Sequence, residues 1–395
     1  MNSPDKNLEQ PIIDVPTGED YKDIREAVRR VCEAFGPEYW REKDEAEAYP
    51  TEFIDALTSA GFLAALIPQE YGGTGLPLRA ASVILEEVCN AAAGHAQMYT
   101  MGTILRHGSD AQKRKYLPQI AAGKLRLQAF GVTEPTTGSD TTQLKTRATK
   151  TEHGYRLKGQ KIFTSRAQHS DLMLAIARTT PLGETKGRTH GISTFLIDIR
   201  AALGKGLEIR PIKTMVNHHT TEVFFDDLDI PADALIGEEG KGFRYILDGM
   251  NAERVLTAAE AIGSTKWFVR TATKYANERR VFDRAIGQNQ SIQFPIAQAH
   301  IQMEAADLMV RRAAAMFEAG VPCGAEANMA RYLAAECLWN AAEACMQTHG
   351  GYGFAREFGV ERKWREARLA RIAPVSTNLI LAHVAQHVLG LPRSY

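Results

Sequence analysis

The stretch VTEPTTGSD, residues 132–140, lies about a third of the way along the 395-residue chain. Pro135 and Gly138 favour an irregular, tightly turned loop, because proline fixes φ and glycine adopts conformations that other residues avoid. Hydroxyl groups and backbone N–H groups without strand or helix partners are crowded into such a loop. The stretch is therefore suited to binding a polar ligand through main-chain donors.

The hydrophobic pattern differs on the two sides of this loop. From about residue 21 to 124, apolar residues recur at three- and four-residue spacing, which predicts helices. Short apolar runs bounded by polar turns predict strands at 155–159, 172–177, 192–197 and 222–226. After residue 242 the helical spacing returns, and it predicts helices over 243–278, 289–319, 325–348 and about 376–389.

These patterns together predict an α+β protein with an α–β–α order of domains. Four long C-terminal helices joined by short loops favour an antiparallel bundle. We therefore expect an N-terminal helical domain (1–124), a middle β-domain (125–235) and a C-terminal four-helix bundle (236–395). Residues 1–17 are polar and contain prolines, so they are expected to be disordered or extended.

Composition excludes several classes of function. Lysine plus arginine and aspartate plus glutamate both number 47, and this balance argues against a nucleic-acid partner or a membrane-surface protein. No run reaches the roughly 18–20 apolar residues that cross a bilayer. The N-terminus has no apolar signal-peptide core, and the tail Arg393-Ser394-Tyr395 is not a peroxisomal tripeptide. We therefore expect a cytoplasmic protein.

Metal and disulfide chemistry are not expected either. The five cysteines are scattered, odd in number and form no CxxC pair, which favours a reducing compartment. His218 and His219 are adjacent, and neighbours on a strand point to opposite faces. Because no acidic or thiol partner lies at ligand spacing, we predict no metal site.

The loop and several other segments resemble the acyl-CoA dehydrogenases, flavoproteins that oxidise acyl thioesters. Residues 133–140 match the T-E-P-x-x-G-S-D segment of that family. The other matching segments occur in the family's order and together place the resemblance over roughly residues 20–390: Tyr71–Gly75, Lys161–Ser165, Arg279–Phe282 with Gln290, Gln347–Gly353 and Arg365–Arg368. The resemblance implies the α–β–α fold described above and FAD as the cofactor.

The resemblance also implies which residues contact FAD. Phe163 would cover the isoalloxazine ring, where the family usually has tryptophan, and Ser165 would bind near N5. The remaining predicted contacts are Phe130, Val132, Thr133, Gly138 and Ser139 for the flavin and its phosphates, Arg279 for the pyrophosphate, Gln290, Gln347, Gly350 and Gly351 for the adenosine, together with Phe282, Ser376 and Asn378. In the family several of these contacts come from a neighbouring subunit, so a homotetramer or a homodimer is implied.

The catalytic base is where this chain departs from the family. Most members carry a glutamate in an I-Y-E-G-T segment, whose carboxylate removes the α-proton and whose backbone N–H binds the thioester carbonyl. The matching residues 372–377 read IAPVST, and Pro374 supplies neither a carboxylate nor an N–H. The Val375 N–H or a ribityl hydroxyl of the flavin would have to replace the lost donor.

A substitute base is predicted on another helix. The isovaleryl and long-chain members place their glutamate just before an arginine, and here Glu253 precedes Arg254. Glu253 is therefore the predicted base and Arg254 its orienting partner, although a helix-surface ion pair is the alternative. Glu260 is a second candidate, because seven residues is about two helical turns.

The resemblance implies an oxidoreductase that converts an acyl-CoA to a trans-2-enoyl-CoA in fatty-acid β-oxidation, with an electron-transfer flavoprotein as acceptor. The alternative is a relative of the same fold with other chemistry, such as a flavin monooxygenase, a nitroalkane oxidase or an acyl-CoA desulfinase. A flavoprotein without activity is a third possibility.

The loop at Met215–His219, on the substrate side, is about two residues shorter than in the family. Residues expected to line the acyl pocket are Gln97, Met98, Tyr99 and Met101.

Overall fold

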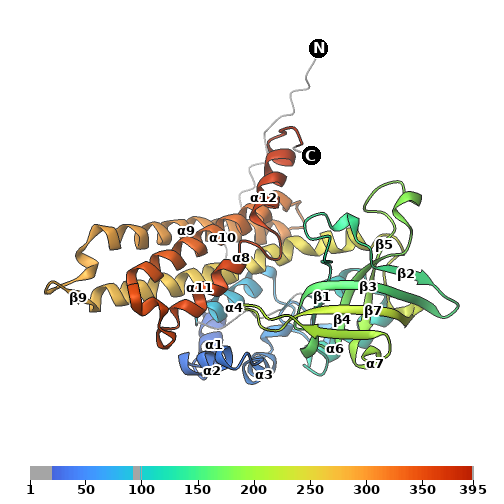
Figure 1. Cartoon of the computed structure of the whole chain (residues 1–395), viewed down its shortest axis with the longest axis horizontal. Helices are drawn as coiled ribbons and strands as arrows, with labels where there is room; N and C mark the ends of the chain where they lie inside the picture. Colours follow the sequence, from blue (N-terminus) through green and yellow to red (C-terminus); the bar gives the residue numbers. More distant parts are fainter. Residues whose placement is uncertain (1–19, 92–97, 99, 394–395) are drawn as a thin grey trace, which may run out of the picture.

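The computed structural model describes residues 20–91, 98 and 100–393. Residues 1–17, which were expected to be disordered or extended, lie outside the described residues. Helices from the two ends of the chain pack beside one another, and a β-sheet lies at one end of this helical body (Figure 1). The α+β class and the α–β–α order predicted from the sequence are confirmed.

Helices dominate the described N-terminal residues. The start of the last of them, at Asp110, shows how sequence sets a boundary: the Ser109 hydroxyl accepts from the Gln112 N–H at 3.2 Å, and the Gln112 side chain accepts from the Ser109 N–H at 2.8 Å. This reciprocal pair satisfies two donors that a helix start leaves open. The helices are α1 (Lys22–Cys32), α2 (Pro37–Glu45), α3 (Thr51–Ser59), α4 (Leu78–Asn90), α5 (Gly102–His107) and α6 (Asp110–Ala121).

The middle of the chain folds into one sheet with the strand order β6-β7-β3-β2-β4-β5-β8, and β1 pairs with β4 in parallel. Each of the four strand segments predicted from sequence falls within an observed strand. β4 is buried at all seven positions, which explains its continuous apolar run. The strands are β1 (Leu127–Gly131), β2 (Arg147–Lys150), β3 (Gly154–Ser165), β4 (Leu172–Arg178), β5 (Ile192–Asp198), β6 (Leu207–Pro211), β7 (Thr220–Pro231) and β8 (Leu235–Ile236), with a short helix α7 (Ile199–Ala202) after β5.

Three long helices form the C-terminal body: α8 (Gly242–Glu278), α9 (Gln290–Glu318) and α10 (Gly324–His349). A hairpin of β9 (Arg280–Val281) and β10 (Arg284–Ala285) joins the first two. The segment expected as a fourth long helix is shorter, because α12 (Thr377–His383) gives way to a π-helical turn over Val384–Val388. α11 (Val360–Leu369) packs against α10, and α12 projects from the body (Figure 1).

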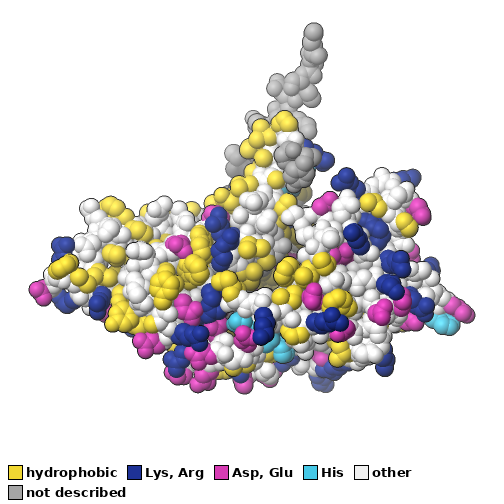
Figure 2. Space-filling model, viewed as in Figure 1, with side chains coloured by type: hydrophobic (Ala, Val, Ile, Leu, Met, Phe, Trp, Pro, Cys, Tyr) yellow, Lys and Arg dark blue, Asp and Glu magenta, His cyan; other side chains and the backbone are white. Residues whose placement is uncertain are grey.

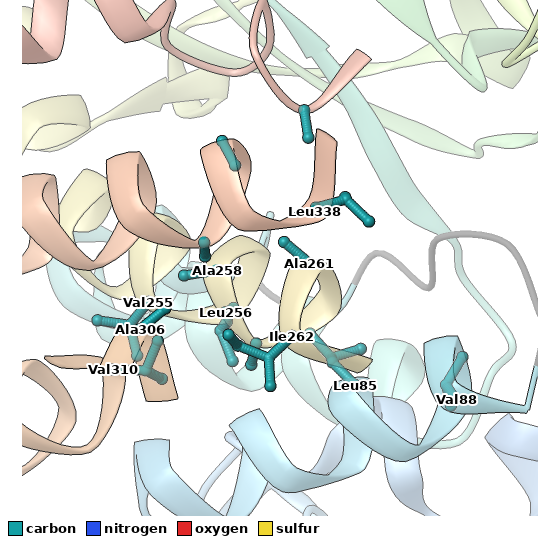
Figure 3. Packing of buried hydrophobic residues seen from close by; sticks show 14 of the residues in the cluster. Leu85, Val88, Val255, Leu256, Ala258, Ala261, Ile262, Ala306, Val310 and Leu338 are labelled. Carbon is teal, nitrogen blue, oxygen red and sulfur yellow. The ribbon is translucent and has the colours of Figure 1, made fainter. Parts of the chain in front are cut away.

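One hydrophobic core joins the N-terminal and C-terminal helices. Leu85 and Val88 of α4 pack with Val255, Leu256 and Ile262 of α8 (Figure 3). The two helices approach closely at Gly263, where an added Cβ would lie 2.0 Å from the Glu86 carbonyl oxygen. Only glycine permits this distance. Within the described ranges, no helix is both long and apolar enough to cross a bilayer.

Candidate active site

A buried ion pair joins the loop after β1 to strand β3. The Lys161 ammonium on β3 lies 2.8 Å from the Glu134 carboxylate, and the same carboxylate accepts from the N–H groups of Lys145 at 2.6 Å and Thr146 at 3.0 Å. Burial lowers the pKa of Lys161 to about 8, although Glu134 opposes this shift. Burial acts to raise the pKa of Glu134, but Lys161 and the hydrogen bonds bring it below its ordinary value. The ion pair and these hydrogen bonds therefore hold the loop in place against β3.

The upper side of this loop is open. Thr133 accepts from the Ile162 N–H at 2.9 Å, so β3 fixes its backbone. A Cβ added at Gly138 would meet nothing within 4 Å, and Ser139 is exposed. A ligand can thus approach these backbone groups directly. Phe130 and Val132 border the opening and pack together with Leu144, Ile176 and Ile192.

Phe163 and Ser165 lie near the end of β3, beside this loop. The pairing of β3 with β7 is irregular between Lys161 and Thr164, and Phe163 adopts φ 56°. This left-handed conformation is unusual for an aromatic residue, and it accompanies a ring that is 61% exposed. The Ser165 hydroxyl accepts a hydrogen bond from the Asn217 side chain at 2.8 Å. Sequence reasoning missed Asn217, because nothing in the local pattern predicts that contact.

A second group of the predicted cofactor residues lines a cavity of about 550 Å³ at the end of α10. Arg279, Gln347, Gly350 and Gly351 all line it. The Arg279 guanidinium lies 5.7 Å from the centre of the Tyr352 ring. Cβ atoms added at either glycine would meet nothing within 4 Å, so the backbone there is accessible. A cation, an amide side chain and open backbone groups suit the phosphates and adenosine of a dinucleotide.

His349 and Tyr275 form part of the wall of this cavity. Their rings stack at 4.1 Å, and the His349 Nδ1 donates to the Cys345 carbonyl at 2.8 Å. Phe282 lies in the turn between β9 and β10 and is 93% exposed, and Gln290 is the first residue of α9. Neither of these two predicted contacts lines the cavity itself.

The two groups lie near opposite ends of α8 (Figure 1). α8 begins beside the sheet and ends at Glu278, next to the cavity at Arg279. A helix of 37 residues is about 55 Å long. The structure therefore does not bring all the predicted cofactor residues of one chain together. Ser376 and Asn378 belong to neither group: Ser376 caps α12 by accepting from the Leu379 N–H at 3.4 Å, and Asn378 is exposed on that helix.

Glu253 lies on α8, where its side chain is partly exposed but deeply surrounded by protein. Burial raises the pKa of Glu253; the charge of Arg254 opposes this shift, and that of Glu260 adds to it. The Arg254 Nη1 donates to the Asn251 side chain at 2.9 Å, whereas its Nε has no hydrogen-bond partner among the described residues. Arg254 thus acts on Glu253 through charge.

A buried arginine connects Glu253 with the segment that contains Pro374. Arg331 of α10 is 2% exposed, and its Nη2 donates to the carbonyls of Ala370 at 2.5 Å and Ala373 at 2.7 Å. Burial lowers the pKa of Arg331 to about 10, and the charges of Glu260 and Glu253 oppose the shift. Arg331 therefore fixes the backbone just before Pro374. No local pattern indicated this role, since arginine on a helix is usually solvated.

One argument made from the sequence about the histidines of this region does not hold. His218 and His219 lie in a turn before β7 and not on a strand, so the argument from alternating strand faces was wrong. Among the described residues, no cluster of three potential metal ligands occurs. Met98 and Met101 are 4% and 2% exposed and belong to the hydrophobic cores. Gln97 and Tyr99 lie outside the described residues.

Domain models of one family match the chain in three consecutive parts. The acyl-CoA dehydrogenase N-terminal domain matches residues 18–124, the middle domain 129–228 and the C-terminal domain 240–389. The chain belongs to the acyl-CoA dehydrogenase family. It is therefore an enzyme of this type, in a family whose cofactor is FAD.

Individual relatives agree with this assignment. The acyl-CoA dehydrogenase FadE12 of Mycobacterium tuberculosis is 36% identical over 388 residues, which cover 95% of this chain and 98% of the relative. The structure of a glutaryl-coenzyme A dehydrogenase in complex with glutaryl-CoA has a TM-score of 0.88 at 27% identity, covering 97% of this chain and 98% of that one. The FAD complex of PigA has a TM-score of 0.84 at 28% identity, covering 93% and 97%.

Proposed function

We propose that this enzyme oxidises an acyl-CoA to the trans-2-enoyl-CoA, with Glu253 as the base that removes the α-proton. The observation that carries the proposal is the carboxyl of Glu253, which is deeply surrounded by protein beside Arg254 and has a raised pKa. Bound FAD would accept the hydride from Cβ. A raised pKa makes a carboxylate a stronger base and brings it closer to the operating pH. Pro374 has no group that could do this.

The thioester carbonyl needs a hydrogen-bond donor, because the α-proton of a thioester is only weakly acidic. Removing one such donor typically costs roughly 10²–10³ in turnover. Val375 is the first residue after Pro374 that carries an N–H. The hydrogen bonds of Arg331 to Ala370 and Ala373 hold the preceding backbone and would support this substitute donor. A ribityl hydroxyl of the cofactor is the other available donor.

The residues near the β1 loop fit the flavin half of FAD. Open backbone at Gly138 and the exposed Ser139 would bind phosphate oxygens, while the exposed ring of Phe163 would cover the isoalloxazine. The Ser165 hydroxyl would bind near N5. The cavity at Arg279 and Gln347 fits the pyrophosphate and adenosine of a second FAD molecule.

We infer that the enzyme is a homotetramer or a homodimer in which two copies complete each site. One FAD is too short to reach both groups of residues in a single chain, since α8 separates them by about 55 Å. α9 carries an exposed apolar stripe of Phe294, Ile301 and Leu308 at seven-residue spacing. Apolar side chains also cover much of the α12 projection, including Leu381 (Figure 2). A second copy would bury these surfaces.

The CoA part of the substrate has a candidate binding surface. A cavity of about 340 Å³ lies where the β4–β5 loop meets the start of α8. The cavity is lined by Lys186, Lys241 and His190, together with Thr180 and Thr185. Lys241 also forms an ion pair with Glu238 at 2.7 Å. Phosphate groups of CoA would pair with the ammonium groups of Lys186 and Lys241. Replacing Lys186 with glutamine would then raise KM for an acyl-CoA and leave KM for the matching acyl-pantetheine unchanged.

We place the reaction in cytoplasmic fatty-acid β-oxidation, with an electron-transfer flavoprotein as acceptor. The domain boundaries at 124/125 and 235/236 belong to the same proposal.

Anaerobic titration of the purified yellow enzyme with saturated acyl-CoAs tests the proposed oxidation of an acyl-CoA to the enoyl-CoA. Bleaching of the flavin with formation of the enoyl-CoA is expected. If no acyl-CoA bleached the flavin while dithionite still did, dehydrogenation would be excluded.

The presence of Pro374 where the family has glutamate favours one other function. A flavoenzyme of this fold that forms no thioester enolate would not require a carboxylate and an N–H at position 374. Examples are a flavin monooxygenase, a nitroalkane oxidase and an acyl-CoA desulfinase. Rapid consumption of oxygen by the reduced enzyme, with a hydroxylated, oxidised or desulfinated product, would support this second function. Slow oxygen consumption with an enoyl-CoA product would exclude it.

A further inference from the structure

Asn217 lies in the loop before β7, and its side chain reaches the end of β3. Its Nδ2 donates to the Ser165 hydroxyl at 2.8 Å. The two side chains are half-buried. Ser165 and Thr220 face each other in the β3–β7 ladder, and the Arg166 N–H donates to the His219 carbonyl at 2.6 Å. The residues that follow Asn217 are therefore paired with the end of β3.

The backbone of Asn217 is held in one conformation. It adopts φ 54°, a left-handed value that asparagine tolerates better than most residues. Its carbonyl accepts from the hydroxyls of Thr220 at 2.7 Å and Thr214 at 3.3 Å. The side chain is thus aimed at Ser165 by the main chain, before any ligand binds.

His218 fixes the same loop to the helical body. Its Nδ1 lies 3.2 Å from the Thr214 carbonyl, and its Nε2 lies 3.1 Å from the Asp44 carboxylate of α2. Arg365 of α11 binds the same carboxylate at 2.5 Å and the Met215 carbonyl at 2.5 Å. Segments from all three parts of the chain therefore hold the loop in place.

The geometry points to Asn217 as a positioning residue that sets the direction of the Ser165 hydroxyl proton. A hydroxyl has one proton and two lone pairs. Because Asn217 donates to one lone pair, the proton is directed elsewhere, toward the open side of the β3 end. This inference rests on the proposed contact between Ser165 and flavin N5. N5 can accept that proton only in the oxidised flavin, since reduced N5 carries its own hydrogen.

The consequence is a specific effect on the flavin. With Asn217 present, Ser165 favours the oxidised cofactor. Without it, Ser165 can turn and accept from reduced N5, so the midpoint potential becomes more positive. Asn217→Gly is the variant of choice, because glycine adopts φ 54° without strain and alanine does not.

The test is a double-mutant cycle on the midpoint potential of bound FAD, measured with redox dyes and without substrate. We expect Asn217→Gly to shift the potential in wild-type enzyme and to cause no further shift in Ser165→Ala enzyme. Met215→Ala is the control from the same loop. The Met215 side chain is exposed, and the contact with Arg365 uses only the Met215 carbonyl, so no shift of the midpoint potential is expected.

Two results would overturn the inference. One is an unchanged potential in Asn217→Gly enzyme that retains FAD and its thermal unfolding midpoint. The other is an equal shift in the wild-type and Ser165→Ala backgrounds, which would show that Asn217 does not act through Ser165. Because no acyl-CoA takes part, a failure of the proposed dehydrogenation would be seen separately, in the substrate titration.

Discussion

The Lys161 ammonium and the Glu134 carboxylate form an ion pair at 2.8 Å, with side chains that are 0% and 4% exposed. Lys161 also donates to the Val132 carbonyl at 3.2 Å. The pair connects the middle of β3 to the loop that carries the predicted flavin contacts. The glutamate of the T-E-P segment is therefore a support for the loop, because its oxygens point into the protein.

We expect Lys161→Met to lower the free energy of unfolding by about 3–5 kcal/mol, because it leaves a buried carboxylate without its counter-ion. FAD should also be lost more readily. Chemical denaturation and cofactor retention on gel filtration measure both effects. Lys158→Met on the same strand is the control, since its pair with Asp227 at 2.9 Å is exposed and is worth about 0–1 kcal/mol. Similar losses in both variants would contradict the argument.

Glu253→Gln should slow flavin reduction by the best acyl-CoA by about 10²–10⁴-fold, the usual contribution of a general base. The amide keeps the size of the side chain but cannot take a proton. Stopped-flow absorbance at the flavin band measures the rate, and reduction by dithionite should be unchanged. Glu260→Gln is the matched comparison on the same helix. A larger loss in that variant would reassign the base to Glu260.

Arg279→Gln should weaken FAD binding by roughly 10- to 100-fold, which corresponds to the loss of one charge-assisted hydrogen bond. Equilibrium dialysis of FAD against the apoprotein gives this value. Arg280→Gln provides the control, because Arg280 is exposed on β9 and does not line the cavity. If both variants bound FAD like the wild type, the cavity would not be the adenosine site.

Gly263→Ala should destabilise the helical core by at least the 1–3 kcal/mol typical of overpacking, because the new Cβ would lie 2.0 Å from the Glu86 carbonyl oxygen. α4 and α8 would have to separate. Thermal unfolding detects the change. Gly324→Ala at the start of α10 should leave stability nearly unchanged, since the closest atom to its Cβ would be 4.0 Å away.

Acid should destabilise the protein through His169. Burial lowers the pKa of His169 to about 4, and the charge of His219 adds to this shift. The unfolded chain has a histidine pKa near 6.5 and so binds more protons between about pH 6.5 and 4. The free energy of unfolding therefore falls as pH falls through this range.

Urea unfolding at several pH values measures this slope. His169→Phe should flatten it while keeping a ring stacked on Tyr49, 4.1 Å away in the wild type. His153→Gln, at an exposed turn, is the comparison. An equally steep slope in the His169 variant would show that other groups cause the acid sensitivity.

Local pattern was sufficient for most of the fold. Strand alternation and helical spacing depend on neighbours a few residues apart, so β3, β4, β5, β7 and the three long C-terminal helices could be predicted. α11 was missed, because its sequence is mostly charged and its burial comes from α10. The end of α12 was misplaced because nothing in the apolar spacing marks the change to a π-helical turn.

The sequence by itself determined the family, the order of the cofactor segments and the loss of both donor and base at Pro374, since each depends on residue identity alone. Only the tertiary structure decided that the predicted cofactor residues form two groups separated by the length of α8, and that Glu253 lies within the electrostatic influence of Glu260 and Arg331. It also decided the Glu134–Lys161 and Ser165–Asn217 contacts. Such relationships join residues far apart in the chain, and their energies depend on burial and distance, which no local pattern encodes.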